Sequence, residues 1–290
     1  MSILLNKDTR VIVQGITGKI GTIQTRWMLD YRTRVVGGVT PGKGGSVIEG
    51  CPVFNSVAEA VKQTGANASV FFVPAAFVLD AFLETVDAGI KFIVVVPEHI
   101  PVHDVMKMRA YARKNKVLAL GPTTPGILVP GIGKMGIMPG SLFTPGKVGI
   151  ISRSGTLSYE FAGILSDAGI GQSVVLGLGA DPVVLSNLLE ILERFEEDFD
   201  TEAVIVVGEV GGEQEERAAD FMANHMSKPV ASYIAGRFSP EGKRMGHAGA
   251  IIRGSVGTAK SKITTLTEAG VTVLNSPIEV VDWARQHQLR

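Results

Sequence analysis

Cysteine and long hydrophobic runs are both scarce in this sequence of 290 residues, whose single cysteine is Cys51. One cysteine cannot close an internal disulfide or build a cysteine-based zinc site, so a disulfide-rich secreted scaffold is excluded. No apolar stretch reaches the roughly 20 residues that span a bilayer, although 45% of the residues are hydrophobic. The composition therefore predicts a soluble protein of a reducing compartment.

An excess of charge of either sign is also missing. Lys plus Arg and Asp plus Glu number 28 each, and there is no basic block. This balance offers little to nucleic acid or an anionic membrane, so we expect small-molecule and protein partners. Residues 1–10 show neither the apolar core of a secretory signal nor an Arg- and Ser-rich leader, and we expect cytoplasmic localisation.

The chain is longer than most single domains, and short β-branched runs alternate along it with helix-length segments. In the first half the predicted strands are 11–14, 35–39, 68–73, 92–96 and 117–120, and the predicted helices are 21–29, 56–64, 78–88 and 102–114. In the second half the predicted strands are 148–151, 173–176, 203–207, 229–234 and 271–274, and the helices include 156–168 and 213–226. This alternation predicts two α/β domains, each a doubly wound parallel sheet.

Glycine and proline crowd residues 121–146, a composition typical of linkers. The segments on either side are each long enough to bury a core of their own. We therefore predict a first domain at residues 1–121, a Gly/Pro-rich linker at 122–146 and a second domain at 147–290.

A glycine turn follows the first predicted strand, with the sequence Gly15-Ile16-Thr17-Gly18-Lys19-Ile20-Gly21. Glycines permit close approach of the backbone, and a helix that begins here points its free N–H groups at the turn. Such a turn is typical of the phosphate site of a nucleotide-binding fold. A tight strand-to-helix turn without a ligand is the alternative.

The end of the second predicted strand separates the candidate ligands. A dinucleotide enzyme usually has an acidic residue there to hold a ribose hydroxyl, whereas this chain continues Pro41-Gly42-Lys43-Gly44-Gly45. A cation in place of the carboxylate favours a ligand with an additional phosphate, such as NADP or CoA with its 3′-phosphate, over NAD. A P-loop is excluded because Gly44 occupies the Ser/Thr position that binds magnesium. A solvated loop lysine is the simpler alternative for Lys43.

A hydroxyl-rich turn in the second half, Ser152-Arg153-Ser154-Gly155-Thr156, follows the strand predicted at 148–151 and opens a helix. Hydroxyl groups and the helix dipole can neutralise an anion there, so the turn predicts a phosphate site. An ordinary serine N-cap accounts for the same residues without a ligand.

Among the five histidines, His247 has the setting of a catalyst. It lies among small residues and follows two cations, in Gly242-Lys243-Arg244-Met245-Gly246-His247-Ala248-Gly249-Ala250. A neutral imidazole nitrogen is a competent nucleophile toward a phosphoryl group, and nearby cations can stabilise the phosphohistidine. His99, His103, His225 and His287 have no comparable setting. No second His or Cys lies at ligand spacing, which argues against a metal site.

A carboxylate follows the strand predicted at 203–207, in the sequence Gly208-Glu209. Ligands of parallel sheets collect at this edge. Glu209 is therefore a candidate to orient His247, and capping of the following helix is its alternative role.

Taken together, these motifs resemble the α subunits of the succinyl-CoA synthetase (succinate–CoA ligase) family. The resemblance covers residues 15–18, 37–45, 152–159, 208–212 and, most specifically, 242–252. It implies a Rossmann-like CoA-binding domain followed by a flavodoxin-like ligase domain that carries a phosphohistidine. It also implies a separate β subunit whose ATP-grasp domain binds ATP or GTP with Mg²⁺, in a heterodimer or an α2β2 heterotetramer.

The resemblance implies a role for each matching position. His247 corresponds to the phosphorylated histidine, Glu209 to the carboxylate that contacts it and Tyr159 to a position associated with the substrate. The helix start that holds the phosphate corresponds to Ser152, Arg153, Ser154, Gly155 and Thr156. The positions that correspond to CoA-binding residues are Thr17, Gly18, Lys19, Ile20, Lys43, Val96, Pro97 and Glu98.

Three loops depart from the family pattern. Thr123 and Thr124 replace an asparagine and a cysteine near the thiol end of CoA. Pro97 and His99 replace the threonine and glycine that usually flank the glutamate, and Ala180 replaces a glycine. These changes leave open whether the acid is succinate, malate, itaconate or another short acid.

The resemblance leads to the hypothesis of a three-step, reversible relay. A nucleoside triphosphate phosphorylates His247, the phosphohistidine passes the group to a carboxylate, and the CoA thiolate attacks the acyl phosphate. A non-catalytic CoA-binding regulatory protein and an NADP-dependent oxidoreductase are the alternatives. The joint presence of His247, Glu209 and the Ser152 turn argues against the regulatory protein, and calorimetry with NADPH and CoA side by side distinguishes the oxidoreductase.

Overall fold

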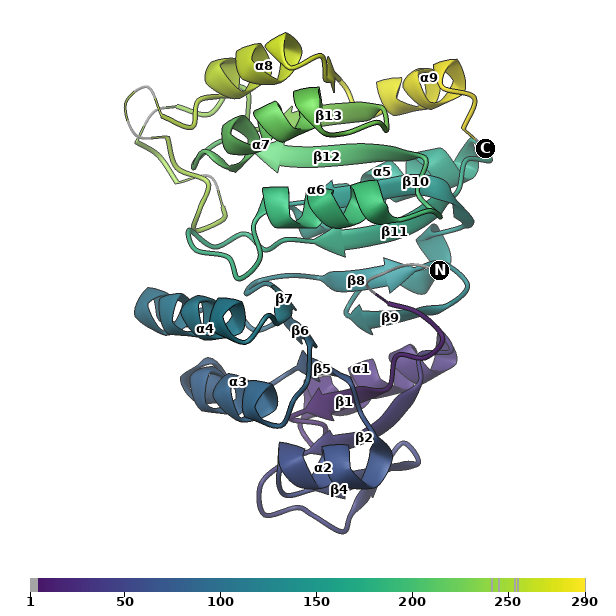
Figure 1. Cartoon of the computed structure of the whole chain (residues 1–290), viewed down its shortest axis with the longest axis vertical. Coiled ribbons are helices and arrows are strands. Elements are labelled where there is room, and N and C mark those ends of the chain that lie inside the picture. Colours follow the sequence, from purple (N-terminus) through teal and green to yellow (C-terminus); the bar gives the residue numbers. More distant parts are fainter. Residues whose placement is uncertain (1–4, 241, 245, 253, 255, 290) are drawn as a thin grey trace. The chain divides into compact units, whose positions relative to one another are not determined.

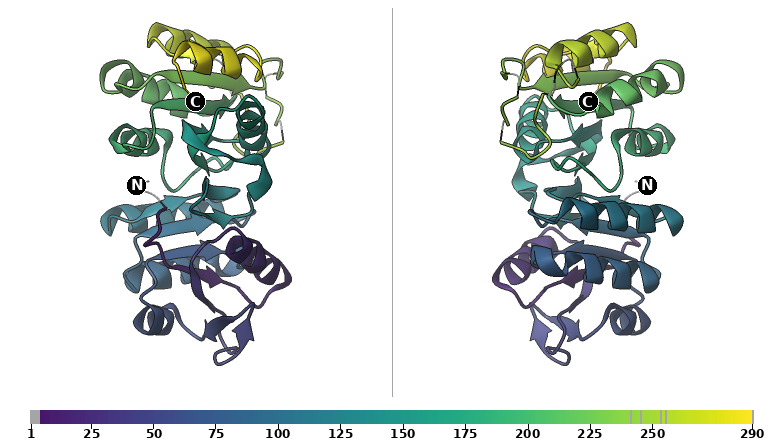
Figure 2. Two further views of the ribbon diagram at one scale, coloured as in Figure 1. Left: turned by 90° about the vertical axis from the view of Figure 1, so that its right-hand side faces the viewer. Right: turned by 90° about the vertical axis from the view of Figure 1, so that its left-hand side faces the viewer.

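The computed structural model describes residues 5–240, 242–244, 246–252, 254 and 256–289, and these divide into two compact units. The N-terminal unit comprises residues 5–138 and 183–186, and the C-terminal unit comprises residues 139–182 and the described residues from 187 onward. Each unit is an α/β structure with helices on both faces of its sheet (Figures 1 and 2). The predicted fold class, two α/β domains with mainly parallel sheets, is thereby confirmed.

Seven strands form the sheet of the N-terminal unit, in the order β3-β4-β2-β1-β5-β6-β7. They are β1 (Val11–Gln14), β2 (Val35–Val39), β3 (Val47–Ile48), β4 (Cys51–Phe54), β5 (Ala68–Phe71), β6 (Phe92–Val95) and β7 (Leu118–Leu120). The helices are α1 (Lys19–Asp30), α2 (Val57–Thr64), η1 (Ala75–Phe77), α3 (Val78–Asp87) and α4 (Val102–Lys114). The β3–β4 pair is antiparallel and the other pairs of this sheet are parallel. The predicted strands and helices of this half are all present, and β3 and β4 were not predicted.

Burial on both faces makes these strands recognisable in the sequence. Every residue of β1, β5 and β6 is buried, as expected for parallel strands covered by helices on both sides. Phe71 of β5 packs against Phe82 of α3 with a ring-centroid distance of 6.4 Å. Ser56 caps the N-terminus of α2, where its hydroxyl accepts from the Glu59 amide, and Gly65 caps the C-terminus in the left-handed conformation.

The segment predicted as a linker, residues 122–146, contains regular structure. Strands β8 (Gly126–Val129) and β9 (Gly133–Gly136) form an antiparallel hairpin, both strands are buried throughout, and the 3-10 turn η2 (Gly140–Leu142) follows. Gly126 and Gly136 both have positive φ, and a Cβ on Gly126 would lie 1.9 Å from the Met135 carbonyl oxygen. These glycines thus allow two backbone segments to pack closely together. A high glycine content in the sequence is equally typical of a flexible linker, so the sequence does not distinguish the two roles.

The C-terminal unit contains five parallel strands in the order β14-β13-β12-β10-β11. They are β10 (Pro145–Ser152), β11 (Gln172–Gly177), β12 (Ala203–Glu209), β13 (Val230–Ala235) and β14 (Thr272–Val273). The helices are α5 (Gly155–Asp167), α6 (Leu188–Glu197), α7 (Gln214–Asn224), α8 (Ala259–Glu268) and α9 (Glu279–Gln286). The strands predicted for this half and the two named helices are present.

Each sheet has a point where successive strands are added on opposite sides. β1 lies between β2 and β5, and β10 lies between β11 and β12. Ligands of doubly wound folds bind outside the carboxyl ends of the strands at such a switch point. The glycine turn follows β1 and the hydroxyl-rich turn follows β10, so both predicted anion sites lie at switch points.

Candidate functional site

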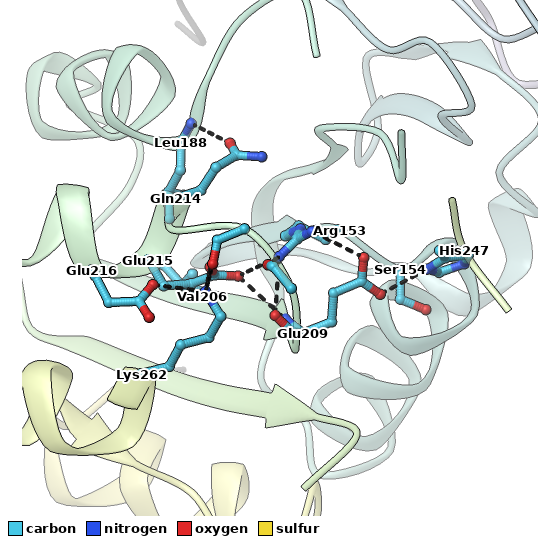
Figure 3. A network of polar contacts seen from close by, with 12 residues as sticks. Arg153, Ser154, Leu188, Val206, Glu209, Gln214, Glu215, Glu216, His247 and Lys262 are labelled. Carbon is cyan, nitrogen blue, oxygen red and sulfur yellow. Dashed lines mark hydrogen bonds and ion pairs between the residues drawn. The ribbon is translucent and has the colours of Figure 1, made fainter. Parts of the chain in front are cut away.

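His247 and Glu209 meet beyond the carboxyl end of β12 (Figure 3). Nδ1 of His247 lies 2.7 Å from Oε2 of Glu209, and the two residues are 38 positions apart in the sequence. The Glu209 side chain is 7% exposed and the His247 side chain 36% exposed. Because an ionised carboxylate only accepts hydrogen bonds, Nδ1 donates, and the lone pair of the neutral ring is on Nε2. The pairing predicted from the sequence is therefore present.

Arg153 holds both the backbone and the carboxylate of Glu209. Its Nη1 donates to the carbonyl oxygens of Glu209 and Gly211, at 3.0 and 2.9 Å, and to Glu215 Oε1 at 3.2 Å. Its Nη2 lies 3.3 Å from Glu209 Oε1. Burial alone would lower the pKa of Arg153, but Glu215 and Glu209 outweigh burial and raise it above its ordinary value. The guanidinium thus binds protein groups, and the phosphate contact expected of Arg153 stays a prediction.

The rest of the hydroxyl-rich turn forms the start of α5. Ser152 Oγ donates to the Ser154 carbonyl at 2.6 Å and accepts from the Ser154 amide at 3.0 Å. Ser154 is the N-cap of α5, and its hydroxyl accepts from the Leu157 amide at 3.4 Å. Gly155 and Thr156 are the first residues of the helix, where backbone N–H groups have no partner within the helix. The serine cap considered as an alternative is present, and donors for an anion lie beside it.

Backbone contacts hold the His247 segment against two other loops of the C-terminal unit. The Gly249 amide donates to the Ala180 carbonyl at 3.0 Å. Gly211 has φ +90°, and a Cβ there would lie 2.2 Å from the Gly249 carbonyl oxygen. Arg244 Nε donates to the His247 carbonyl at 3.3 Å. Ala180 makes its contact with Gly249 through its backbone carbonyl. The replacement of the family's glycine by Ala180 therefore leaves this hydrogen bond intact.

Tyr159, the position associated with substrate, lies on α5 and is half-buried. Its ring packs edge-on against Phe143, with a centroid distance of 6.4 Å and an interplanar angle of 88°. Burial raises the pKa of the Tyr159 phenol. The hydroxyl therefore stays protonated at neutral pH and can donate a hydrogen bond.

The glycine turn of the N-terminal unit is tight, and the helix start beside it is exposed. A Cβ on Gly21 would lie 2.2 Å from the Gly15 carbonyl oxygen. Gly18 is the N-cap of α1, and no side chain caps this helix. Lys19 and Ile20 follow it at the surface, with Ile20 57% exposed. The predicted phosphate site thus has exposed backbone donors at the start of α1.

The loop that carries Lys43 is held in place from two sides. Thr17 Oγ1 donates to Thr40 Oγ1 at 3.2 Å, which joins the glycine turn to the end of β2. Asn55 Oδ1 accepts from the amides of residues 42 and 44, both at 2.9 Å, and so fixes the backbone on either side of the exposed Lys43. Asn55 was not predicted, because its sole signal in the sequence is its position directly after a short strand.

The third predicted CoA-binding element follows β6. Val96 and Pro97 are half-buried and Glu98 is exposed. The Pro97 carbonyl accepts from the Thr123 amide at 3.1 Å, and the buried Thr124 hydroxyl accepts from the amide two residues on at 3.0 Å. The eight predicted CoA-binding positions therefore lie at the carboxyl ends of β1, β2 and β6, which parallel strands bring to one edge of the sheet.

The described residues contain neither a membrane-spanning helix nor a cluster of metal ligands. No helix within this part of the chain is both long and apolar enough to cross a membrane. Nor do three or more His, Cys, Asp or Glu side chains among these residues gather in a way that could hold a metal ion.

Comparison with known proteins assigns the chain to a class and then to a family. A family model described as a CoA binding domain matches residues 6–99, and one described as CoA-ligase matches residues 151–272. With this fold and site, the matches define a CoA ligase. The succinate–CoA ligase [ADP-forming] subunit alpha of Methanothermobacter thermautotrophicus is 53% identical over 283 residues, which cover 98% of this chain and 96% of that protein. The same subunit of Aquifex aeolicus is 52% identical over 282 residues, covering 97% and 92%. The chain belongs to the family of succinate–CoA ligase α subunits.

Solved structures share the fold at lower identity. An ATP citrate lyase from Methanothrix soehngenii, in complex with citrate and coenzyme A, superimposes with a TM-score of 0.87 and 23% identity, covering 99% of this chain and 52% of that chain. An acetyl-coenzyme A synthetase from Ca. Korarchaeum cryptofilum gives 0.77 and 21%, covering 96% and 60%. This chain therefore spans 52% and 60% of those longer chains. The fold is a Rossmann-like CoA-binding domain followed by a flavodoxin-like ligase domain.

Proposed function

We propose that this chain is the α subunit of a nucleoside-diphosphate-forming acid–CoA ligase. In the proposed reaction succinate, CoA and a nucleoside triphosphate give succinyl-CoA, nucleoside diphosphate and phosphate, reversibly. The observation that carries the proposal is the 2.7 Å contact between His247 and Glu209 at the switch point of the C-terminal sheet. Family membership supports the reaction class, and the names of the relatives support succinate and ADP.

His247 is the proposed nucleophile of the first step. Its Nε2 attacks the terminal phosphorus of the nucleotide, the N–P bond forms as the P–O bond breaks, and the nucleoside diphosphate leaves with the electron pair. Nδ1 keeps its proton, so the phosphorylated ring is cationic. Glu209, which is 7% exposed, stabilises that charge more strongly than a solvated carboxylate would.

The remaining steps return the ring to its starting state. An oxygen of the acid attacks phosphorus, the N–P bond breaks, and its electron pair returns to Nε2. The CoA thiolate, its proton released to solvent, then attacks the acyl carbon, and phosphate leaves. Ser154, Gly155 and Thr156 at the start of α5 supply donors for the phosphoryl group, and Ser152 shapes this phosphate site through its hydrogen bonds to Ser154. Tyr159 on the same helix contacts the acid.

The N-terminal unit is the proposed CoA site. The start of α1, formed by Thr17, Gly18, Lys19 and Ile20, offers backbone donors for phosphate, and the exposed Lys43 suits the 3′-phosphate. The loop of Val96, Pro97 and Glu98 completes the site at the same sheet edge.

Family membership as an α subunit implies a partner subunit. We place ATP or GTP with Mg²⁺ on a β subunit with an ATP-grasp domain, in a heterodimer or α2β2 heterotetramer. Because the sequence has no P-loop, nucleotide chemistry on the partner is consistent with this chain. Cytoplasmic localisation belongs to the same proposal.

Labelling with the γ-phosphate of ATP or GTP tests the proposed function. With a β-type partner subunit present, the wild-type chain should acquire acid-labile label and His247→Asn should not. His225→Asn is the matched control, because His225 ends α7 and stacks on Phe221 with a centroid distance of 5.6 Å. Label on His247→Asn would refute the assignment.

A hydroxamate assay with succinate, malate and itaconate identifies the acid, and activity without a partner would overturn the two-subunit proposal.

A further inference from the structure

A chain of buried charges connects Glu209 to helix α8 (Figure 3). Lys262 of α8 is fully buried, and its Nζ donates to the Gly212 carbonyl at 2.9 Å, to Glu215 Oε2 at 2.6 Å and to Glu216 Oε2 at 2.7 Å. Since an ammonium group has three N–H donors, these acceptors use all of them. Lys262 is therefore a fixed charge of the interior.

Glu215 of α7 links this lysine to the site. Its Oε1 accepts from Arg153 Nη1 at 3.2 Å and from the Glu209 amide, also at 3.2 Å. Burial alone would raise the pKa of Glu215, but Arg153 and Lys262 outweigh burial and hold it below its ordinary value. Glu215 is thus ionised at neutral pH. Between Lys262 and His247 lie three side chains, those of Glu215, Arg153 and Glu209 (Figure 3).

The charges of this cluster leave one negative charge in excess. Lys262 and Arg153 contribute two positive charges, and Glu209, Glu215 and Glu216 contribute three negative ones. A buried charge without a partner is strongly unfavourable, so the excess has to lie where a donor meets it. Glu216 meets this condition in part, because its side chain is 16% exposed and its Oε1 accepts from Ser261 Oγ at 3.3 Å. Glu209 meets it at the site, because its Oε2 faces Nδ1 of His247.

Glu215 and Glu209 compete for Arg153. The guanidinium reaches Glu215 at 3.2 Å through Nη1 and Glu209 at 3.3 Å through Nη2. Lys262 approaches Glu215 more closely, at 2.6 Å, and so neutralises much of its charge. Without Lys262, Arg153 would be the main cation beside Glu215, and Coulomb attraction would draw the guanidinium away from Glu209.

We propose that Lys262 is a positioning residue for the phosphorylation of His247. By neutralising Glu215 it leaves Arg153 to hold Glu209 in the orientation that fixes the Nδ1–H tautomer and places the ring lone pair on Nε2. The effect of Lys262 on the rate of His247 phosphorylation rests on the proposed function, whereas its effect on the His247 tautomer does not.

The first test compares the wild-type chain with Lys262→Met. Nitrogen-15 NMR of the histidine rings, with the His247 signals assigned by their loss in His247→Asn, reports the tautomer. We expect the wild-type ring to be Nδ1–H and the variant to show a mixture. With the partner subunit and labelled ATP, single-turnover phosphorylation should slow roughly tenfold in the variant. The ATP concentration for half-maximal rate should be unchanged.

A suppressor variant separates positioning from general stability. Removal of the competing charge makes Lys262 unnecessary, so Lys262→Met/Glu215→Gln should recover the wild-type tautomer and a phosphorylation rate within about threefold of wild type. A purely structural role of Lys262 predicts that the double variant is phosphorylated no faster than the single variant, because a second substitution in the core destabilises the fold further. Lys228→Met is the matched control. Lys228 donates to the Phe195 and Asp198 carbonyls in the same unit, and its loss should leave the His247 ring unchanged.

Several outcomes overturn the proposal. A folded Lys262→Met chain with the wild-type tautomer does so, as does a double variant as slow as the single one. If Lys262→Met does not fold, the tautomer of the double variant decides: a wild-type ring supports the proposal and an altered ring overturns it. If the wild-type chain is never phosphorylated at His247, the proposed function fails, and the tautomer measurements still decide the role of Lys262.

Discussion

The carboxylate of Glu215 occupies the space that a side chain at Gly208 would fill. A Cβ on Gly208 would lie 2.6 Å from Glu215 Oε1 and 2.9 Å from Ile234 Cδ1. The next residue, Glu209, donates its amide to the same carboxylate oxygen at 3.2 Å. The two residues at the end of β12 thus have separate tasks: Gly208 admits the buried carboxylate, and Glu209 contacts His247.

Gly208→Ala should therefore disturb the buried cluster. The added methyl group forces Glu215 or the strand to move, and we expect the free energy of unfolding to fall by about 1–3 kcal/mol. Phosphorylation of His247 should slow in parallel. Denaturant unfolding and single-turnover labelling measure the two effects. Gly163→Ala is the control, since Gly163 lies in α5 with nothing within 4 Å of its added Cβ. Equal stability of Gly208→Ala and wild type would contradict the close approach.

Glu209→Gln should slow phosphorylation of His247 by roughly 100-fold or more, because a neutral amide neither enforces the Nδ1–H tautomer nor stabilises a cationic ring. CoA affinity, measured by calorimetry, should be unchanged. Glu202→Gln is the matched control, since Glu202 pairs with Lys147 at 3.5 Å on the surface. A Glu209→Gln chain phosphorylated at the wild-type rate would remove Glu209 from the mechanism.

Lys43→Ala should weaken CoA binding by about tenfold, the loss of one charge-assisted contact to phosphate. Binding of dephospho-CoA, which lacks the 3′-phosphate, should not change. Calorimetry with both ligands measures the difference, and Lys62→Ala, an exposed lysine on α2, is the control. If Lys43→Ala still binds CoA more tightly than dephospho-CoA by the wild-type factor, the lysine does not contact that phosphate.

Lys134 makes the stability of the N-terminal unit depend on pH. The side chain is 3% exposed, donates to the Met138 carbonyl at 2.7 Å and lies 5.8 Å from the Trp27 ring centroid. Burial lowers the pKa of Lys134 from its ordinary value of 10.5 to about 8. Charged Lys134 thus destabilises the folded state below pH 8. Above pH 8 the folded state binds fewer protons than the unfolded chain, so this destabilisation disappears as pH rises to 10.5.

Wild type should therefore gain stability relative to Lys134→Met between pH 8 and 10.5. Denaturant unfolding followed by Trp27 fluorescence, in a Trp283→Phe background, reports the N-terminal unit. Lys91→Met is the control, because Lys91 is exposed and donates to the Asn115 carbonyl at 3.0 Å. A stability difference between wild type and Lys134→Met that stays constant with pH would disprove the shifted pKa.

Strands were predictable where the sequence has an uninterrupted apolar run such as Phe92–Val95, which is typical of a parallel strand that helices cover on both sides. Strands β3, β4, β8 and β9 were not predicted. β3 has two residues, and β8 and β9 lie among glycines that also occur in flexible segments. A glycine can provide backbone flexibility or allow close packing of the backbone. Which of the two applies depends on the residues that pack against it, and one sequence does not contain that information.

Within the site, local chemistry identified His247 and the start of α5, because a nucleophile among small residues and a serine before a helix are properties of adjacent positions. The sequence by itself thus determined the alternating α/β order, the turns predicted to bind anions and the candidate histidine. Only the tertiary structure decided which charges surround that histidine. Arg153 meets Glu215 across 62 residues and Lys262 meets it across 47, and such pairings arise when separate strands and helices pack around one buried carboxylate.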